Sequence, residues 1–162
     1  MQPFTIINRI NKSDYVNLIL IKSYKNPVTI IMTIIGGMML LFAILSSLHI
    51  IQTSDNNTLF QFIFGFFVLT IPFITKMQAA KMYDNTPKLH RSMQYTFADS
   101  EINCQGNDFS NTFSWAHIVK IEEISKFLLL YTGKNVAEIL NKDLFTNEQL
   151  GFIKAKVYRK MI

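Results

Sequence analysis

The chain has 162 residues, of which 49% are hydrophobic, together with a net charge of +5 and a single cysteine. One cysteine excludes an internal disulfide, and no cluster of cysteine and histidine offers a zinc site. The basic residues form no stripe interleaved with exposed aromatic residues, so we do not expect a nucleic-acid-binding protein. The lone Cys104 lies in a strand-like segment and is expected to be a small buried apolar residue rather than a reactive thiol.

Residues 1–27 are predicted to form a strand followed by a helix. The segment from Pro3 to Ile10 is rich in β-branched residues, which favour a strand. Ser13 is expected to cap the following helix, which has the sequence DYVNLILIKSY. The hypothesis for the strand is that it joins the C-terminal strands, since those alone would build only a small core.

Two long segments without a charged residue are predicted to cross a membrane. The first, residues 28–51, would be about 36 Å long as a helix, which exceeds the roughly 30 Å of hydrocarbon core in a bilayer. It begins too late and runs too long for a secretory signal peptide. The second, residues 58–75, is rich in phenylalanine and carries Pro72 near its end, where the lost hydrogen bond is more easily compensated. Residues 52–57 then form a short extracytoplasmic loop.

Small residues in the first apolar segment fit two interpretations. Gly36 and Gly37, together with Ser46 and Ser47, are suited to a close helix contact, either between the two spans or between protomers. The alternative is that lipid simply tolerates small residues at these positions.

Basic residues predict how the two segments are oriented. The short loop carries Asp55 and no basic residue. Both outer flanks are basic, with Arg9, Lys12, Lys22 and Lys25 before the first segment and Lys76, Lys81, Lys88 and Arg91 after the second. Because basic residues near span ends stay in the cytoplasm, both termini are expected to be cytoplasmic. Residues 76–91 are expected to be a polar, basic linker that leaves the second segment as a helix and then turns at Thr86-Pro87.

Residues 92–162 are predicted to form a small antiparallel β domain closed by a helix. Tyr95 and Phe97 show the period of a half-buried strand, and the segment KFLLLYT is apolar on both faces, as in a central strand. With the N-terminal strand there are roughly seven short strands. Thr146 and Gln149 have the spacing of a capping box at the start of the last helix. The predicted fold class is membrane α+β, with a transmembrane helical hairpin inserted in, or attached to, this β domain.

Four segments resemble the YcxB-like family of small bacterial membrane proteins. They are KSDYVNL, YTFADSEI, FSWAHIVKIEEISKFLLLY and EILNKDLFTNEQLGFIKAKV. The resemblance marks Trp115, Ile118, Glu122, Tyr131 and Lys142 as candidate residues for partner binding or for a structural motif. The family is similar to pleckstrin-homology-like domains, so the resemblance implies that fold and a place in the inner membrane of a bacterium.

The sequence contains no recognisable catalytic constellation. His49, His90 and His117 have no second ligand at metal-binding spacing. Glu122 and Glu123 are adjacent, which directs them to opposite faces of a strand. We therefore expect no enzyme activity and no cofactor.

Two kinds of function remain open. The first is a membrane-tethered interaction module whose cytoplasmic domain binds a protein partner, with an immunity protein against a membrane-acting toxin as a narrower form. The second is sensing of a lipid or small ligand by the β domain. In the first, Trp115 is either an exposed partner anchor or a core residue. The expected partners are membrane lipids, one protein and, as an open alternative, further copies of this chain.

Overall fold

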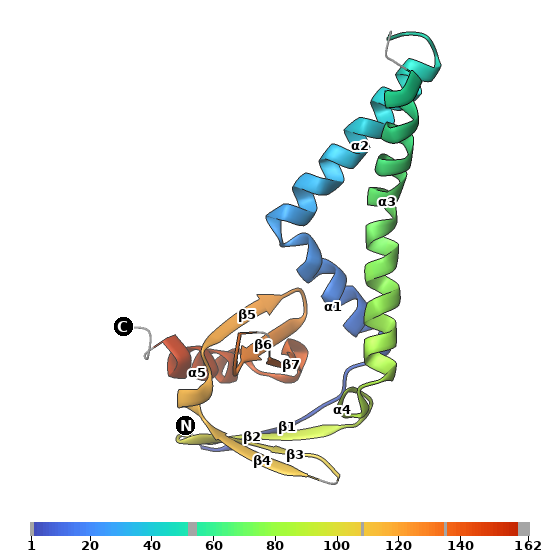
Figure 1. Ribbon diagram of the computed structural model, residues 1–162. Coiled ribbons are helices and arrows are strands. Elements are labelled where there is room, and N and C mark those ends of the chain that lie inside the picture. Colours follow the sequence, from blue (N-terminus) through green and yellow to red (C-terminus); the bar gives the residue numbers. More distant parts are fainter. Residues whose placement is uncertain (1, 52–54, 108, 135, 159–162) are drawn as a thin grey trace. The chain divides into compact units, whose positions relative to one another are not determined.

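A computed structural model describes residues 2–51, 55–107, 109–134 and 136–158 of the chain (Figure 1). The backbone divides into two units. We call Met1–Leu18 with Met82–Ile162 the sheet unit, and Ile19–Lys81 the helix unit. The helices are α1 (Lys12–Tyr24), α2 (Pro27–Ser47), α3 (Asp55–Asp84), α4 (Pro87–His90) and α5 (Asn147–Tyr158). The strands are β1 (Phe4–Asn8), β2 (Met93–Phe97), β3 (Glu101–Gln105), β4 (Ser110–Ser114), β5 (Lys120–Ile124), β6 (Phe127–Tyr131) and β7 (Ala137–Asn141), and the short 3-10 helices are η1 (Trp115–His117) and η2 (Lys142–Leu144).

The first sheet contains four antiparallel strands in the order β1-β2-β3-β4. Phe4 lies opposite Phe97, and Asn8 lies opposite Met93. The hypothesis that the N-terminal strand joins the later strands is therefore confirmed. The whole helix unit is consequently an insertion, in the chain, between two neighbouring strands of one sheet.

The second sheet contains three antiparallel strands in the order β5-β6-β7. All five residues of β6 are buried, because its two faces pack into two different clusters. Leu128 and Leu130 belong to the main core, whereas Phe127, Leu129 and Tyr131 pack in a smaller cluster with Leu18. The prediction of a central strand covered on both faces is confirmed.

The main core of the sheet unit lies between the two sheets, which face each other in Figure 1. Aromatic rings fill one end of it: Phe97 is stacked on Phe4, with 5.1 Å between ring centroids, and meets Phe145 edge-on at 5.7 Å. Helix α5 adds Ile153 and Val157 to the same core. Helices and antiparallel sheets together make the fold α+β, as predicted.

One of the two predicted helix caps is present in the structure and the other is not. At α5, Gln149 accepts a hydrogen bond from the Thr146 backbone N–H at 2.9 Å, and Thr146 Oγ1 accepts one from the Gln149 N–H at 3.3 Å, so the capping box is confirmed. At α1, the expected cap Ser13 is wrong. Asn11 caps this helix instead, with Oδ1 accepting a bond from the Asp14 N–H at 2.8 Å. Asparagine caps at least as well as serine, so the helix begins after Asn11, which comes first in the chain.

Both helices of the predicted hairpin differ in length from the expectation. The first ends at Ser47 rather than at residue 51. Ser47 Oγ donates back to the Ala43 carbonyl oxygen at 2.8 Å, and His49 adopts a positive φ of 57°. The second begins at Asp55 rather than at residue 58, so the end of the predicted loop 52–57 is helical, while residues 52–54 of that loop lie outside the described residues. It continues to Asp84, so Pro72 lies inside it and not near its end, and the expected helical start of the linker 76–91 is confirmed. The segment after Pro72 contains Ala79 and Ala80, which favour helix.

Helices α2 and α3 approach closely where glycines face the neighbouring helix. A Cβ atom on Gly36 would lie 2.6 Å from the Val68 side chain, and one on Gly65 would meet Leu40. Gly37, in contrast, has no other atom within 4 Å of such a Cβ. Ser46 Oγ and Thr58 Oγ1 lie 3.2 Å apart. Of the two interpretations, close helix contact therefore holds at Gly36 and Ser46.

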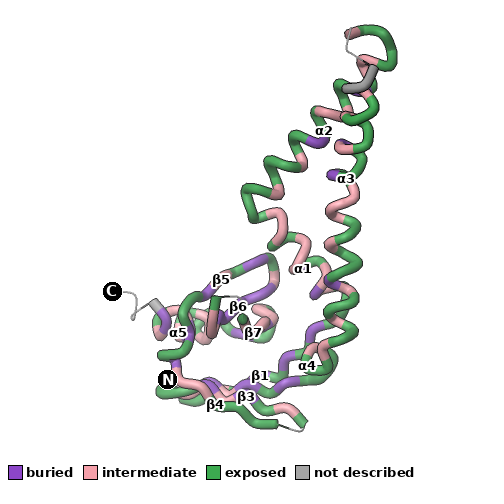
Figure 2. The backbone as a smooth tube through the Cα atoms, viewed as in Figure 1, coloured by how far each residue is buried: buried purple, intermediate pink, exposed green. Residues whose placement is uncertain are grey.

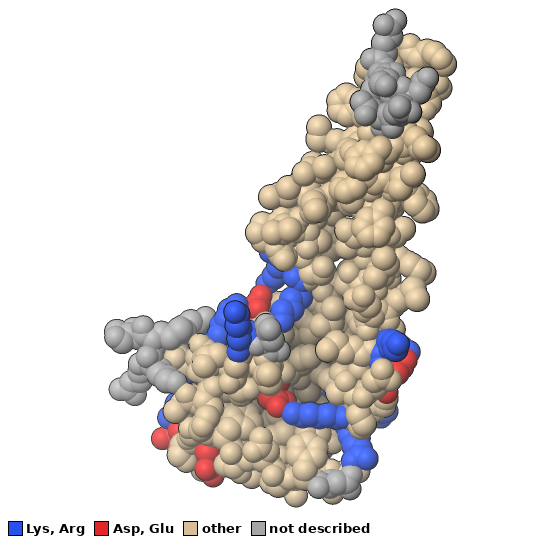
Figure 3. Space-filling model, in the orientation of Figure 1, with Lys and Arg blue, Asp and Glu red and all other residues tan. Residues whose placement is uncertain are grey.

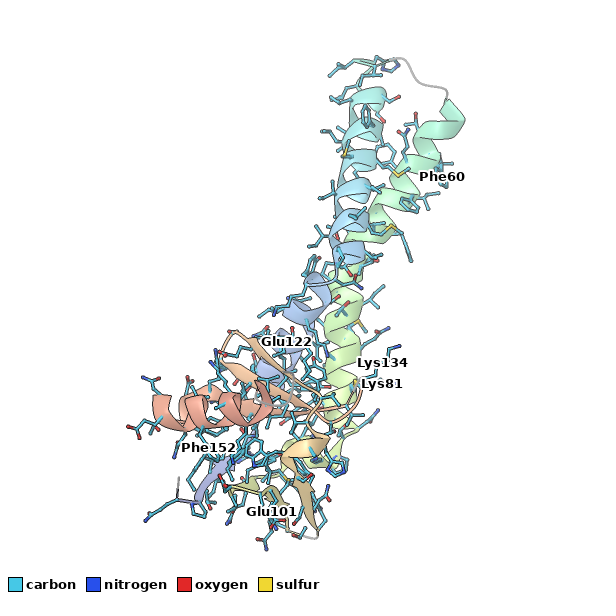
Figure 4. All side chains as sticks on the ribbon, turned by 90° about the vertical axis from the view of Figure 1, so that its left-hand side faces the viewer. Phe60, Lys81, Glu101, Glu122, Lys134 and Phe152 are labelled. Atoms are coloured by element: carbon cyan, nitrogen blue, oxygen red, sulfur yellow. The ribbon has the colours of Figure 1, made fainter. Side chains whose placement is uncertain are left out.

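The surface of the helix unit is strongly apolar. Along α2 and α3 most of the tube is exposed or intermediate in Figure 2, and only scattered positions are buried. Acidic and basic side chains gather on the sheet unit and at helix ends in Figure 3, and the middle of α2 and α3 shows none on that face. Phe60 points away from the helix pair in Figure 4 and is 60% exposed. Two helical stretches, Pro27–Ser47 and Thr58–Asp84, are long and apolar enough to cross a membrane.

Candidate functional site

Three of the five residues singled out by the sequence are buried: Trp115, Ile118 and Tyr131. Trp115 is 7% exposed, and its Nε1 donates a hydrogen bond to the carbonyl oxygen of Ala98 at 2.9 Å. Its ring meets Phe152 of α5 edge-on, with 5.8 Å between centroids. Ile118 is 1% exposed. Trp115 and Ile118 hold the corner between β4 and β5, and of the two roles left open for Trp115, the core role fits its burial.

Tyr131, Glu122 and Lys142 take part in two separate hydrogen-bond and ion-pair arrangements. Tyr131 donates from its hydroxyl to Glu122 Oε2 at 3.0 Å. Lys142 Nζ lies 3.2 Å from Glu123 Oε2. Glu122 is marked on β5 in Figure 4. The five candidates therefore do not converge on one cavity, and a direct role of any of them in binding stays a prediction.

Glu123 joins β5 to the last helix. Lys154 Nζ lies 2.6 Å from its Oε1, while Lys142 reaches the other oxygen. The hydrogen bond from Lys154, with a smaller contribution from Lys142, holds the pKa of the Glu123 carboxyl below its usual value. This carboxylate therefore has a structural partner on each oxygen.

A pocket of about 360 Å³ opens elsewhere on the sheet unit, between β1, β2, β7 and the segment around α4. Its floor is buried: Tyr15, Met93 and Tyr95 are each at most 5% exposed. Its rim is open, with Met82 59% and Val136 63% exposed. Most of its wall is apolar, with Ile10, Tyr15, Met82, Leu89, Met93, Val136 and Ile139 among the lining residues.

The polar part of the pocket is built around Glu138 of β7. Lys88 Nζ lies 2.6 Å from Glu138 Oε1, and the Tyr95 hydroxyl donates to Oε2 at 2.7 Å. Burial first, and then the charge of Glu138, raise the pKa of Tyr95 well above its usual range. Burial also raises the pKa of the neighbouring Cys104 thiol, which lies opposite Tyr95 on β3. Both are neutral side chains at neutral pH, so Glu138 is the one anion facing Lys88 in this group.

Local structure around α4 holds the basic residues Lys88 and Arg91 at the pocket. Pro87 opens α4 because its preset φ suits the first helical position. His90 Nε2 donates to the Tyr83 carbonyl oxygen at 2.7 Å, and the Tyr83 hydroxyl donates to the Ile10 carbonyl oxygen at 2.8 Å. These bonds tie the α4 segment to the chain that follows β1. Lys88 and Arg91 are thereby held at the same pocket.

Asn8 closes the other side of the pocket. It is 3% exposed, and its Nδ2 donates to the Ile139 carbonyl oxygen at 2.9 Å. Its Oδ1 accepts a bond from the Asn141 backbone N–H at 3.1 Å. The side chain thus replaces the strand-to-strand bonds that β1 and β7 do not make.

The arrangement supports binding more readily than bond-breaking chemistry. Both oxygens of Glu138 already accept a hydrogen bond, which leaves a poor general base. Within the ranges that the structure covers, no group of three or more His, Cys, Asp or Glu side chains is placed to hold a metal ion. The pocket can enclose a small apolar body and present cations to one end of it.

Strands β3 to β7 and nearly all of α5 lie within a segment that matches one protein family. Residues 97–157 match the model of the YcxB-like protein family. The resemblance seen in the sequence is thereby confirmed over this segment, which includes Trp115, Ile118, Glu122, Tyr131 and Lys142. The YcxB-like segment begins at the last residue of β2 and supplies Glu138 to the pocket, whereas Lys88 and Arg91 precede it. No curated protein and no solved structure matches this chain.

Proposed function

We propose that this chain is a membrane-anchored, non-enzymatic interaction module. The observation that carries the proposal is the large apolar surface of α2 and α3, where big side chains stand exposed. A continuous surface of this kind is not stable in water and calls for lipid or another apolar cover. Examples are Ile31, Ile34, Ile63, Phe66, Phe67 and Phe73.

The charge distribution supports an orientation with the sheet unit in the cytoplasm. Lys22 and Lys25 precede α2, and Lys76 and Lys81 lie beyond the apolar part of α3. Basic residues at these ends favour the cytoplasmic side, so both termini would be inside. For the bacterial host that the family resemblance implies, this is the inner membrane.

Single-cysteine labelling tests the anchor and its orientation together. In a Cys104→Ser background, Asn56→Cys should react with a membrane-impermeant maleimide in intact spheroplasts, whereas Ser100→Cys should react only after permeabilisation. Ser100 is an exposed position of the β2–β3 turn, so its protection in intact cells would come from the membrane. Release of the protein from membranes by alkaline carbonate, or labelling of Ser100→Cys from outside, would contradict the proposal.

A pleckstrin-homology-like fold is the finer architectural proposal. Its support is the order of elements: seven antiparallel strands in two sheets, followed by one helix. In that fold the loop after the first strand commonly holds phosphate groups. Here the same loop position is taken by the whole helix unit, which argues against phosphate binding at that place.

A protein partner is the occupant that we propose for the exposed edge of the first sheet. β4 is the last strand in this sheet, and Ser110, Asn111 and Thr112 are exposed on it. Within the described residues, β4 pairs with β3 alone. A free edge of this kind can accept an extended segment of another protein as an additional strand.

Affinity purification with matched variants tests the partner. Asn111→Lys places a charge on the free edge, and Gln94→Lys places the same charge at an exposed position of the inner strand β2. A stoichiometric protein retained by the wild type and by Gln94→Lys, but lost with Asn111→Lys, would support binding at the edge. Equal retention by all three would contradict it.

The narrower proposal is an immunity protein that neutralises a membrane-acting toxin. Its support is the combination of a membrane anchor with a small binding domain. Co-expression with the product of a toxin-like neighbouring reading frame should rescue growth, and Asn111→Lys should abolish the rescue. If the wild-type protein does not rescue growth, the immunity proposal is contradicted.

Sensing of a lipid or small ligand is the second candidate function. The specific observation in its favour is the pocket beside α4, because small-ligand sites are usually concave and mostly apolar, with a few polar groups.

A further inference from the structure

The pocket beside α4 has the size and lining of a small-molecule site. Its volume of about 360 Å³ is at the lower end of the range found for ligand pockets. The lining residues that the structure describes all belong to the sheet unit. The buried floor of Tyr15, Met93 and Tyr95 keeps one end dry, while the rim remains open.

Charged side chains line part of this pocket. The lining residues include two cations, Lys88 and Arg91, and one carboxylate, Glu138. A lysine ammonium has three donors, and the bond to Glu138 Oε1 uses one of them. Lys88 can therefore bind a second anionic group without leaving Glu138.

The apolar wall is adaptable as well as large. Met82 at the rim and Met93 on the floor contribute long, unbranched side chains. Methionine fits ligands of varied outline because its side chain is flexible and polarisable. Ile10, Leu89 and Ile139 provide more rigid apolar surface beside them.

We propose that this pocket binds an amphiphile with one apolar chain and one anionic group, as in a fatty acid or a lysophosphatidic acid. The apolar chain lies against the methionines and aliphatic side chains, and the anionic group meets Lys88 and Arg91. Two sources have this chemistry, the bilayer and the soluble metabolite pool. Met82 follows the apolar stretch 58–75 by only seven residues in the chain, which favours the bilayer.

The proposal deepens the second candidate function, and only its choice of the bilayer as source rests on the proposed membrane anchor. Binding itself needs the sheet unit alone. The two are tested separately, since the labelling experiment above examines the anchor and the following one examines the pocket.

The test uses the full chain in nanodiscs of phosphatidylcholine, titrated with radiolabelled oleate. Lys88→Gln should weaken retention about tenfold, because it removes a charge-assisted hydrogen bond worth roughly that factor. Lys88→Arg keeps the cation and should restore most of the binding. Lys134→Gln removes the same charge from an exposed residue that is not among the pocket lining, and should bind as the wild type does (Figure 4).

A second variant tests the apolar part. Val136 is exposed at the rim, so Val136→Trp can block the mouth without filling the core, and it should prevent oleate retention. The fluorescence of Trp115 does not serve in this variant, so far-UV circular dichroism checks its folding. Retention of oleate by a folded Val136→Trp protein would overturn the proposal.

Charge selectivity and source complete the test. Monoolein, a neutral amphiphile, should bind much more weakly than oleate. Binding of monoolein as tight as that of oleate, or equal losses with Lys88→Gln and Lys134→Gln, would overturn the proposal. Mass spectrometry of amphiphiles retained from native membranes, against titration with soluble octanoate, assigns the ligand to the bilayer or to the soluble pool.

Discussion

The Asn8 amide on β1 donates a hydrogen bond to the Ile139 carbonyl oxygen on β7, across 2.9 Å. This contact connects two strands that belong to different sheets and are separated by 131 residues in the chain. The same side chain accepts a bond from the Asn141 backbone N–H. A single asparagine thus closes one side of the sheet unit.

Asn8→Ala should lower the free energy of unfolding by about 2 kcal/mol, because it leaves two backbone groups at a buried site without partners. Fluorescence of Trp115, the one tryptophan in the chain, reports unfolding of this unit during urea titration. Asn103→Ala is the control, since Asn103 makes an exposed side-chain bond to Thr112. That change should cost less than about 0.5 kcal/mol. Equal losses in the two variants would refute the closing role of Asn8.

Gly65→Ala should loosen the contact between α2 and α3. The new methyl group would lie 2.8 Å from the Gly36 carbonyl oxygen and would also meet Leu40. Backbone atoms cannot yield as a flexible side chain does, so we expect a loss of about 1–3 kcal/mol.

Disulfide formation measures that loosening. Ser46→Cys and Thr58→Cys replace two hydroxyl groups 3.2 Å apart and should cross-link readily in a Cys104→Ser background. The disulfide yield should fall with Gly65→Ala. It should remain unchanged with Gly37→Ala, because a Cβ atom at Gly37 would have no neighbouring atom within 4 Å. A loss of cross-linking with Gly37→Ala as well would show that any added methyl group disturbs these helices.

Cys104 should resist alkylation while the protein is folded. It is 1% exposed, and burial raises the pKa of its thiol, so little of the reactive thiolate forms near pH 8. Unfolding should increase the rate of reaction with maleimide by orders of magnitude. Ser100→Cys supplies an exposed thiol for comparison and should react quickly in both states; rapid reaction of native Cys104 would contradict its burial.

Glu123 should make the free energy of unfolding depend on pH in the acid range. Its folded-state pKa is lower than its unfolded-state pKa, chiefly through Lys154, so its contribution is present above the unfolded value of about 4.3 and is lost as the pH falls through the folded value. Glu123→Gln should therefore reduce the loss of stability between neutral and acid pH. Because the pair is partly exposed, the effect at pH 7 should stay below about 1 kcal/mol.

A double-mutant cycle separates this pair from general charge effects. Lys154→Gln combined with Glu123→Gln should cost no more than the larger single change, since both remove the same interaction. Additive losses would mean that Lys154 stabilises the fold through other groups.

Local patterns in the sequence predicted the elements that depend on local chemistry. The apolar run of β6 and the capping box of Thr146 and Gln149 are examples, because burial period and cap geometry act over a few residues. The pairing of β1 followed from a global argument, the small size of the C-terminal core. The prediction of Ser13 as the cap of α1 was wrong because Asn11, an equally good cap residue, stands two residues earlier in the chain.

The pocket could not be predicted in the same way. Its walls come from three separate parts of the chain, and Lys88 meets Glu138 across 50 residues. The spacing of residues in a sequence identifies ligands that share one helix or strand. It does not reveal a contact between residues that are far apart in the chain. Trp115 shows a different limit: tryptophan is common in binding sites and in cores, so the sequence left both roles open, and its 7% exposure fits the core role.

The insertion between β1 and β2 also has a consequence for the order of events during synthesis. Thr5 and Thr96 face each other across the sheet although 91 residues separate them, so β1 has no partner when it leaves the ribosome. It must wait until α2 and α3 have been made, and pairing over so long an interval is intrinsically slow. In a chain anchored as proposed, both crossings of the membrane would come first and the sheet would close afterwards. The first sheet would then be complete only in chains whose two helices have been inserted. A chain stalled during insertion would expose β1 without its partner strand, which makes it a target for cellular proteases.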